Sequence, residues 1–111
     1  MKGGAGYRPD VEGPALEISD CPEAARYEAR LGADLAGFID YRRVSGRLLL
    51  VHTEVLPAYE GRGVASALAR HVLGEARLGR ERVRIMCPYL TTFVERNPGF
   101  RPAADGRIAE A

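Results

Sequence analysis

The sequence predicts a mixed α/β (α+β) domain in which antiparallel hairpins come first and one parallel strand–helix–strand unit follows. Apolar and polar residues alternate in several segments before residue 56, the periodicity becomes helical after Gly63, and alternation returns at residues 82–87. Two strands joined by a helix within one sheet favour a parallel crossover. We therefore expect a mixed, mostly antiparallel sheet with helices packed on it.

Four predicted strands precede the helix. In one of them Tyr27, Ala29 and Leu31 share a face, as the alternation of a half-buried strand requires. The dipeptide Ser45-Gly46 suits a tight hairpin turn between two others. These strands are expected at residues 15–20, 26–31, 35–44 and 47–55.

The last of these strands contains the run Leu48-Leu49-Leu50-Val51, which is apolar on both faces. Such a run is typical of a strand that lies in the middle of a sheet and is covered on both sides. We therefore expect this strand at the centre, beside its parallel partner at residues 82–87.

The helical segment begins after Gly63. Val64, Leu68 and Val72 recur on one stripe, and Gly79 suits the end of the helix. Pro88 is expected to end the strand at residues 82–87, and residues 89–96 predict a short amphipathic helix. Both helices can then bury an apolar face against the sheet.

Length and charge limit the functions open to the chain. Its 111 residues suit one domain, expected at 15–100 between flexible tails at 1–14 and 101–111. The net charge of +1 supplies no long-range field, so we expect neither nucleic acid nor a membrane as partner. The two cysteines, Cys21 and Cys87, form no disulfide framework or metal motif. These features predict a cytoplasmic protein.

A glycine-rich turn, Glu60-Gly61-Arg62-Gly63-Val64-Ala65, joins the central strand to the helix. The first turn of a helix has backbone N–H groups without intrahelical partners, and glycine allows a phosphate to approach the backbone closely. Arg62 can add a charged contact. Taken alone, this spacing is equally compatible with a tight turn that needs glycine only for its geometry.

The residues around this turn resemble the acetyl-CoA motif of the GNAT superfamily of N-acetyltransferases, Gln/Arg-x-x-Gly-x-Gly/Ala. Gly63 and Ala65 match its small positions, whereas Glu60 stands where Gln or Arg is usual. Residues 93–100 are similar to the family's closing Phe-Tyr-x-x-x-Gly-Phe, with Val94 in place of the Tyr. The resemblance implies a GNAT-like acyl-CoA N-acyltransferase fold.

Within the superfamily, the chain looks most like a subfamily of very short, stand-alone members. Their three features are present as His52-Thr53-Glu54-Val55, Glu60 and Cys87-Pro88-Tyr89. The resemblance implies acetyl-CoA as the cofactor, with pantetheine between two strands that diverge at their C-terminal ends. The expected cofactor contacts are Val55, Gly61, Arg62, Gly63, Val64, Ala65, Ser66 and Tyr89.

Glu54 is the first candidate for the base that removes a proton from the acceptor amine. At the end of a buried strand its carboxylate would be desolvated and so a stronger base. The alternative is a strand-end carboxylate that faces solvent. His52, two residues away on the same face, could act through water, or could instead be a core histidine.

Cys87 falls where many members of the superfamily have an asparagine that contacts the cofactor. It could be a nucleophile in a two-step transfer, a weak hydrogen-bond donor to the cofactor sulfur, or a small buried hydrophobe. Direct transfer is usual in the superfamily and is favoured here. Because Val94 replaces the usual acid, the leaving thiolate needs Tyr89, Cys87 or solvent as its proton donor.

The sequence therefore predicts an acetyl-CoA-dependent N-acetyltransferase that acts on an amine of a protein or small molecule, as a monomer or weak dimer. The departures at Glu60 and Val94 favour one alternative, a CoA-binding regulatory module without transferase activity. A third reading is an interaction domain that uses the basic hairpin Arg42-Arg43.

Overall fold

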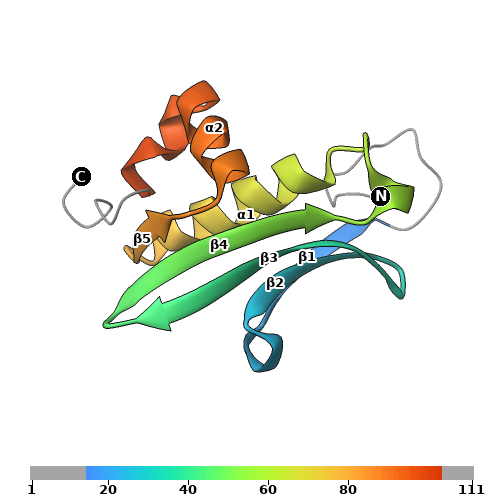
Figure 1. Ribbon diagram of the computed structural model, residues 1–111, viewed down its shortest axis with the longest axis horizontal. Helices are drawn as coiled ribbons and strands as arrows, with labels where there is room; N and C mark the ends of the chain where they lie inside the picture. Colours follow the sequence, from blue (N-terminus) through green and yellow to red (C-terminus); the bar gives the residue numbers. More distant parts are fainter. Residues whose placement is uncertain (1–14, 104–111) are drawn as a thin grey trace.

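The computed structural model describes residues 15–103, which form one five-stranded sheet and two α-helices (Figure 1). The strands are β1 (Leu16–Cys21), β2 (Arg26–Leu31), β3 (Asp34–Val44), β4 (Arg47–Val55) and β5 (Arg82–Ile85). The helices are α1 (Val64–Leu78) and α2 (Pro88–Arg96). Three short 3₁₀ turns complete the chain: η1 (Pro22–Ala24), η2 (Pro57–Tyr59) and η3 (Pro98–Ala103).

The two expected tails lie largely outside the described residues. These are residues 1–14 and, at the other end, residues 104–111, while residues 101–103 belong to η3. Within residues 15–103, no helix is both long and apolar enough to cross a membrane.

The strands lie side by side in sequence order, from β1 to β5. The first three pairings are antiparallel, and β4 pairs with β5 in parallel, with Leu50 opposite Ile85. Between β3 and β4, Ser45 and Gly46 both have positive φ, 52° and 77°, as a two-residue hairpin turn requires. The predicted mixed sheet with one parallel crossover is confirmed.

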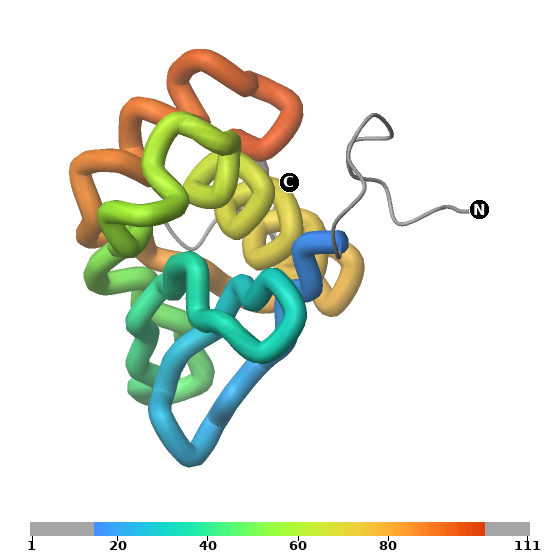
Figure 2. The backbone as a smooth tube through the Cα atoms, turned by 90° about the vertical axis from the view of Figure 1, so that its right-hand side faces the viewer, coloured from blue at the N-terminus to red at the C-terminus, as the bar shows by residue number. Residues whose placement is uncertain are grey.

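Both helices lie on one side of the sheet (Figure 2). The side of α1 that faces the sheet buries Val64, Leu68 and Val72, the stripe that the periodicity predicted. The expectation that helices cover β4 on both faces is wrong. Leu48 and Leu50 are buried, whereas Val51 is 38% exposed, so helix covers one face of β4 only. The strand at the centre of the sheet is β3, and β4 is an interior strand beside the edge strand β5.

The face without helices is covered by its own charged side chains. The guanidinium of Arg26 lies 4.3 Å above the ring of Phe38. Glu28, buried between two strands, accepts hydrogen bonds from Arg26 at 2.9 Å and from Arg30 at 2.9 Å and 3.1 Å. We call this face the open face.

A β-bulge at Val51 changes the direction of every later side chain on β4. Tyr41 of β3 pairs with Leu50, but the preceding residue, Asp40, pairs with His52, so Val51 is an extra residue. A bulge of this kind shifts the alternation of a strand by one position.

Beyond the bulge, the residues that face α1 are therefore Thr53 and Val55, which continue the face of Leu50. His52 and Glu54 turn to the open face instead. Uninterrupted alternation would have placed these four side chains the other way round.

Candidate functional site

The parallel strands β4 and β5 separate at their C-terminal ends. Their last pair is Leu50 with Ile85, followed by a hydrogen bond from the Met86 N–H to the Leu50 carbonyl at 2.9 Å. β4 continues to Val55, but β5 ends at Ile85, two residues earlier than the sequence predicted. Pro88 starts α2 there and takes the chain away from the sheet. The expected divergence of the strands is confirmed, and we call the space between them the gap.

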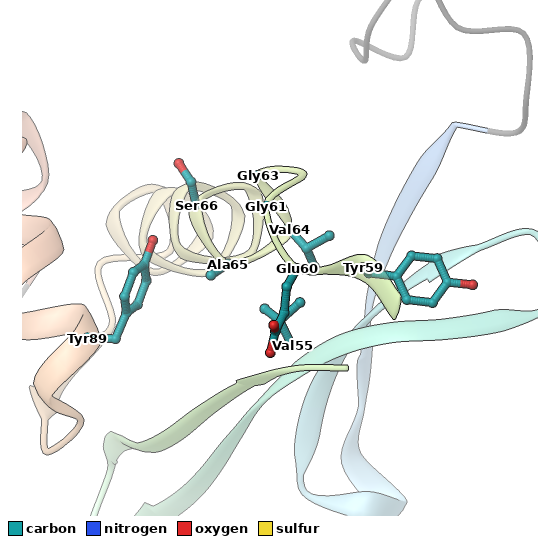
Figure 3. Close-up of a pocket in the computed structure, with 9 residues that line it drawn as sticks. All are labelled: Val55, Tyr59, Glu60, Gly61, Gly63, Val64, Ala65, Ser66 and Tyr89. Atoms are coloured by element: carbon teal, nitrogen blue, oxygen red, sulfur yellow. The ribbon is translucent and has the colours of Figure 1, made fainter. Parts of the chain in front are cut away.

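A pocket of about 250 Å³ lies between the end of β4, the start of α1 and α2 (Figure 3). Every predicted cofactor contact lines this pocket except Arg62, although the role of these residues remains a prediction. Tyr59 and Glu60 also line it and were not predicted to do so. The lining residues are Val55, Tyr59, Glu60, Gly61, Gly63, Val64, Ala65, Ser66 and Tyr89.

The turn before α1 owes its shape to two glycines in the left-handed region. Gly61 has φ 79° and Gly63 has φ 81°, values that other residues adopt only with strain. Gly63 is the N-cap of α1 and offers no side-chain cap. The N–H groups of the first turn therefore have no side-chain cap, and the positive end of the helix dipole lies at the pocket lined by Gly63, Val64, Ala65 and Ser66.

Among the described residues that line this pocket, Glu60 is the charged one. Its side chain extends from the turn toward Val55 (Figure 3). The carboxylate thus lies on the β4 side of the pocket. Its negative charge would oppose a phosphate there, so any phosphate contact has to rely on the backbone of the first helical turn.

Gly37 of β3 allows α1 to start this close to the sheet, a role that the sequence did not predict. A Cβ at this position would lie 2.8 Å from the carbonyl oxygen of Glu54 and 3.0 Å from Cγ1 of Val64. Gly37 also pairs with Val55, so it sets the distance between α1 and the sheet next to the pocket. The available sequence signal was a glycine in a strand interior, which often marks a close approach of another backbone.

Arg62 lies outside the pocket lining. Its guanidinium is 5.5 Å from the centre of the Tyr59 ring, and the Tyr59 hydroxyl donates to Asp34 at 3.3 Å. Arg62 is exposed. A contact between its side chain and a phosphate remains a prediction.

His52 and Glu54 do not lie in the pocket. They point to the open face, with His52 Nε2 and Glu54 Oε1 3.0 Å apart and side chains 54% and 52% exposed. The prediction that Glu54 is desolvated is therefore wrong, because the bulge at Val51 turns it to solvent. His52 is likewise no core histidine; its ring lies 6.4 Å from that of Phe38.

Cys87 is buried at the N-cap of α2, with 3% of its surface exposed. Its Sγ donates a hydrogen bond to Oγ1 of Thr53 across the gap at 3.4 Å. The sequence did not single out Thr53, because without the bulge it would face away from α1. The contact of Thr53 with Cys87 was therefore not predicted and is known from the structure alone.

Tyr89 stands beside the pocket at the start of α2, with its ring 6.3 Å from that of Phe93. Burial raises the pKa of the Tyr89 phenol above its ordinary value; Arg70 opposes this shift and Cys87 adds to it. The phenol therefore stays protonated at neutral pH and can donate a hydrogen bond into the pocket. Among residues 15–103, no three His, Cys, Asp or Glu side chains gather in a way that could hold a metal ion.

Three comparisons with known proteins find similar sequences and a similar fold. Residues 26–103 match the GCN5-related N-acetyl-transferase family. Protein NATD1 of Bos taurus is 30% identical, over 81% of this chain and 88% of the relative. The NMR solution structure of a GCN5-like protein from Staphylococcus aureus superposes with a TM-score of 0.63 at 22% identity, over 82% of this chain and 89% of the other.

Proposed function

Because this chain belongs to the GCN5-related N-acetyltransferase family, and is therefore an acetyltransferase, we propose that it transfers the acetyl group of acetyl-CoA to an amine. The observation that carries the proposal is the pocket at the start of α1, which lies beside the gap between β4 and β5. The acceptor is an amine of a protein or small molecule. The narrower placement in the subfamily of very short members is part of this proposal.

The cofactor would lie with its diphosphate at the first turn of α1. The N–H groups of Val64, Ala65 and Ser66 can bind phosphate oxygens there, since the first residues of a helix lack intrahelical acceptors. The pantetheine arm would run past Val55 into the gap. There β4 extends beyond its last pairing with β5, so its backbone groups on that side can bind an amide chain or polarise a thioester carbonyl.

The chemistry is direct attack of a neutral amine on the thioester carbonyl. The C–N bond forms, the C–S bond breaks, and the electron pair goes to the CoA sulfur. Glu54 and His52 are proposed to take the amine proton on the open face, where their 3.0 Å contact holds them together. Cys87 or Tyr89, on the α1 side of the gap, is proposed to give a proton to the sulfur.

Two observations favour a second candidate function, a CoA-binding module without transferase activity. The family's usual acid position is occupied by Val94, which is packed in the core, and Glu60 places a negative charge in the pocket. Either feature could leave a protein that binds the cofactor and does not turn it over.

Isothermal titration calorimetry with acetyl-CoA and with acetyl-pantetheine tests the proposal. We expect acetyl-CoA to bind and acetyl-pantetheine, which lacks the diphosphate, to bind much more weakly. Acetylation of a panel of amines and peptides, followed by mass spectrometry, then separates the two functions. Binding with no product on any acceptor would favour the binding module, and no binding of acetyl-CoA would remove both.

A further inference from the structure

The contact between Thr53 and Cys87 lies at the inner end of the gap. Val55 and Tyr89, which line the pocket, each come two residues after a member of this pair. Since a strand rises about 3.3 Å per residue, Thr53 lies about 7 Å deeper along β4 than Val55. A pantetheine arm that entered the gap from the pocket would therefore pass Val55 and Tyr89 first and then reach Thr53 and Cys87.

Within residues 15–103, Thr53 is the one side chain that forms a hydrogen bond with the Cys87 thiol. The backbone of Cys87 is held separately: its carbonyl accepts from the Thr91 N–H at 3.1 Å and from the Thr91 hydroxyl at 3.2 Å. The titratable group affected by Cys87 is the Tyr89 phenol, whose pKa is raised mainly by burial, lowered by Arg70 of α1 and raised slightly by Cys87. His52 and Glu54 face the other side of β4.

A threonine hydroxyl both accepts and donates hydrogen bonds, and this property suits a thiol that loses its proton. In the resting protein Sγ donates to Oγ1. After loss of the proton, the hydroxyl can rotate and donate to the thiolate, and such a charge-assisted bond is stronger than the neutral one. The pair can keep its contact through both protonation states.

We propose that Thr53 is a positioning residue for Cys87, which gives its proton to the departing CoA sulfur. The inference rests on the proposed function. As the C–S bond breaks, the Sγ proton passes to the CoA sulfur, and Thr53 stabilises the resulting Cys87 thiolate. The thiolate then regains a proton from the pool that received the one lost by the amine, so charge and protons balance over the cycle.

The test compares Thr53→Val, Thr53→Ala and Thr53→Ser with Thr91→Val as the matched control. Valine keeps the shape of threonine without the hydroxyl, and serine keeps the hydroxyl. Thr91→Val removes a hydroxyl whose hydrogen bond within residues 15–103 goes to the Cys87 backbone. Far-UV circular dichroism identifies the variants that fold. If Thr53→Val does not fold, Thr53→Ala takes its place as the variant without the hydroxyl. Alkylation of Cys87 by iodoacetamide, measured against pH, reports on the thiol without any cofactor.

The alkylation profile of Thr53→Val is expected to move to higher pH by about one unit, because the thiolate loses its donor. Thr53→Ser should restore the wild-type profile, and Thr91→Val should not move it. In acetyl transfer, Thr53→Val should lower kcat about tenfold at an unchanged KM for acetyl-CoA. An unmoved profile, or a kcat that serine does not restore, would overturn the proposal.

The two readouts separate this inference from the proposed function. If the wild-type protein does not bind acetyl-CoA, the function fails, and with it the role of Cys87 in transfer, whatever the alkylation profile shows. If acetyl-CoA is bound and turned over but the profile and kcat of Thr53→Val equal those of the wild type, the function stands and the role of Thr53 fails.

Discussion

Gly63 and Gly46 share one backbone conformation in two very different places. Their φ values are 81° and 77°, and among residues 15–103 a Cβ at either position would meet no atom within 4 Å beyond its chain neighbours. Gly63 begins α1 at the pocket, whereas Gly46 turns the hairpin between β3 and β4. Replacing either glycine therefore introduces the same kind of strain, and only one of the two changes the pocket.

We expect Gly63→Ala and Gly46→Ala to lose similar stability, about 1–2 kcal/mol each, because alanine is strained at positive φ. Only Gly63→Ala should also weaken acetyl-CoA binding, since the first helical turn must shift to relieve the strain. Thermal unfolding and calorimetry on the same samples measure both effects. Equal weakening by Gly46→Ala would mean that binding responds to stability and not to the turn.

The difference between the two sets of predicted residues is also explained at this scale. The residues predicted to contact the cofactor lie mostly in one contiguous turn, whose geometry follows from its own glycines, and their placement together around the pocket could be predicted. The surroundings of Glu54 and Thr53 depend on one extra residue, Val51, in the pairing with β3. Apolar alternation within β4 carries no sign of that bulge, so the exposure of Glu54 and the contact of Thr53 with Cys87 could not be predicted.

The position at which α1 starts depends on Gly37 of β3. Gly37 of β3 lies under Val64 and Leu68, at 3.0 Å and 3.4 Å from the position of an added Cβ, and the nearest atom is a backbone oxygen that cannot move alone. Helix and strand are therefore in direct contact beside Val55. Any side chain at Gly37 has to move α1 or distort β4.

Gly37→Ala should lower the free energy of unfolding by about 1–3 kcal/mol, the usual cost of overpacking a core, and weaken acetyl-CoA binding as α1 shifts. Gly74→Ala is the matched control on α1 itself. Outside its own helix turn, an added Cβ there meets no atom of residues 15–103 within 4 Å, so alanine should stabilise the helix by up to about 1 kcal/mol. Urea unfolding of both variants gives the two signs. An unchanged free energy of unfolding for Gly37→Ala would show that α1 and β3 leave room for a methyl group at this position.

Most elements could be predicted from their local patterns, and the exception has a local cause. β4 and α1 match the expected ranges because a hairpin turn and two glycines bound them. β5 is shorter than predicted because the helix that begins at Pro88 uses Cys87 as its N-cap. Here the helix start prevails over the strand end, and Cys87 contacts Thr53 across the gap instead of extending β5.

At the scale of the whole molecule, the sheet is protected by two different means. One face is covered by α1 and α2, and the other by the ion pairs of Glu28 with Arg26 and Arg30 above Phe38. A sheet with one apolar and one polar face is typical of antiparallel pairing. The stability of the open face should therefore depend on the charge of Glu28, whereas that of the helical face should not.

Hydrogen bonds from Arg26, and then from Arg30, lower the pKa of Glu28 below its ordinary value of 4.5 and outweigh the effect of its burial. A lowered folded-state pKa means that the ionised form stabilises the fold. This stabilisation is complete above pH 4.5 and is lost as the pH falls through the lower folded-state value. Glu28→Gln should therefore cost about 1–3 kcal/mol at pH 7.

The cost of Glu28→Gln should shrink as the pH is lowered from about 5, because protonated Glu28 resembles glutamine. Urea unfolding at a series of pH values measures this difference directly. Glu95→Gln serves as the control, since Glu95 is exposed on α2, and it should change stability little at any pH. If the penalty for Glu28→Gln stayed constant down to pH 3, the stabilisation would come from the packing of the side chain. The ion pairs of Glu28 with Arg26 and Arg30 would then not stabilise the open face.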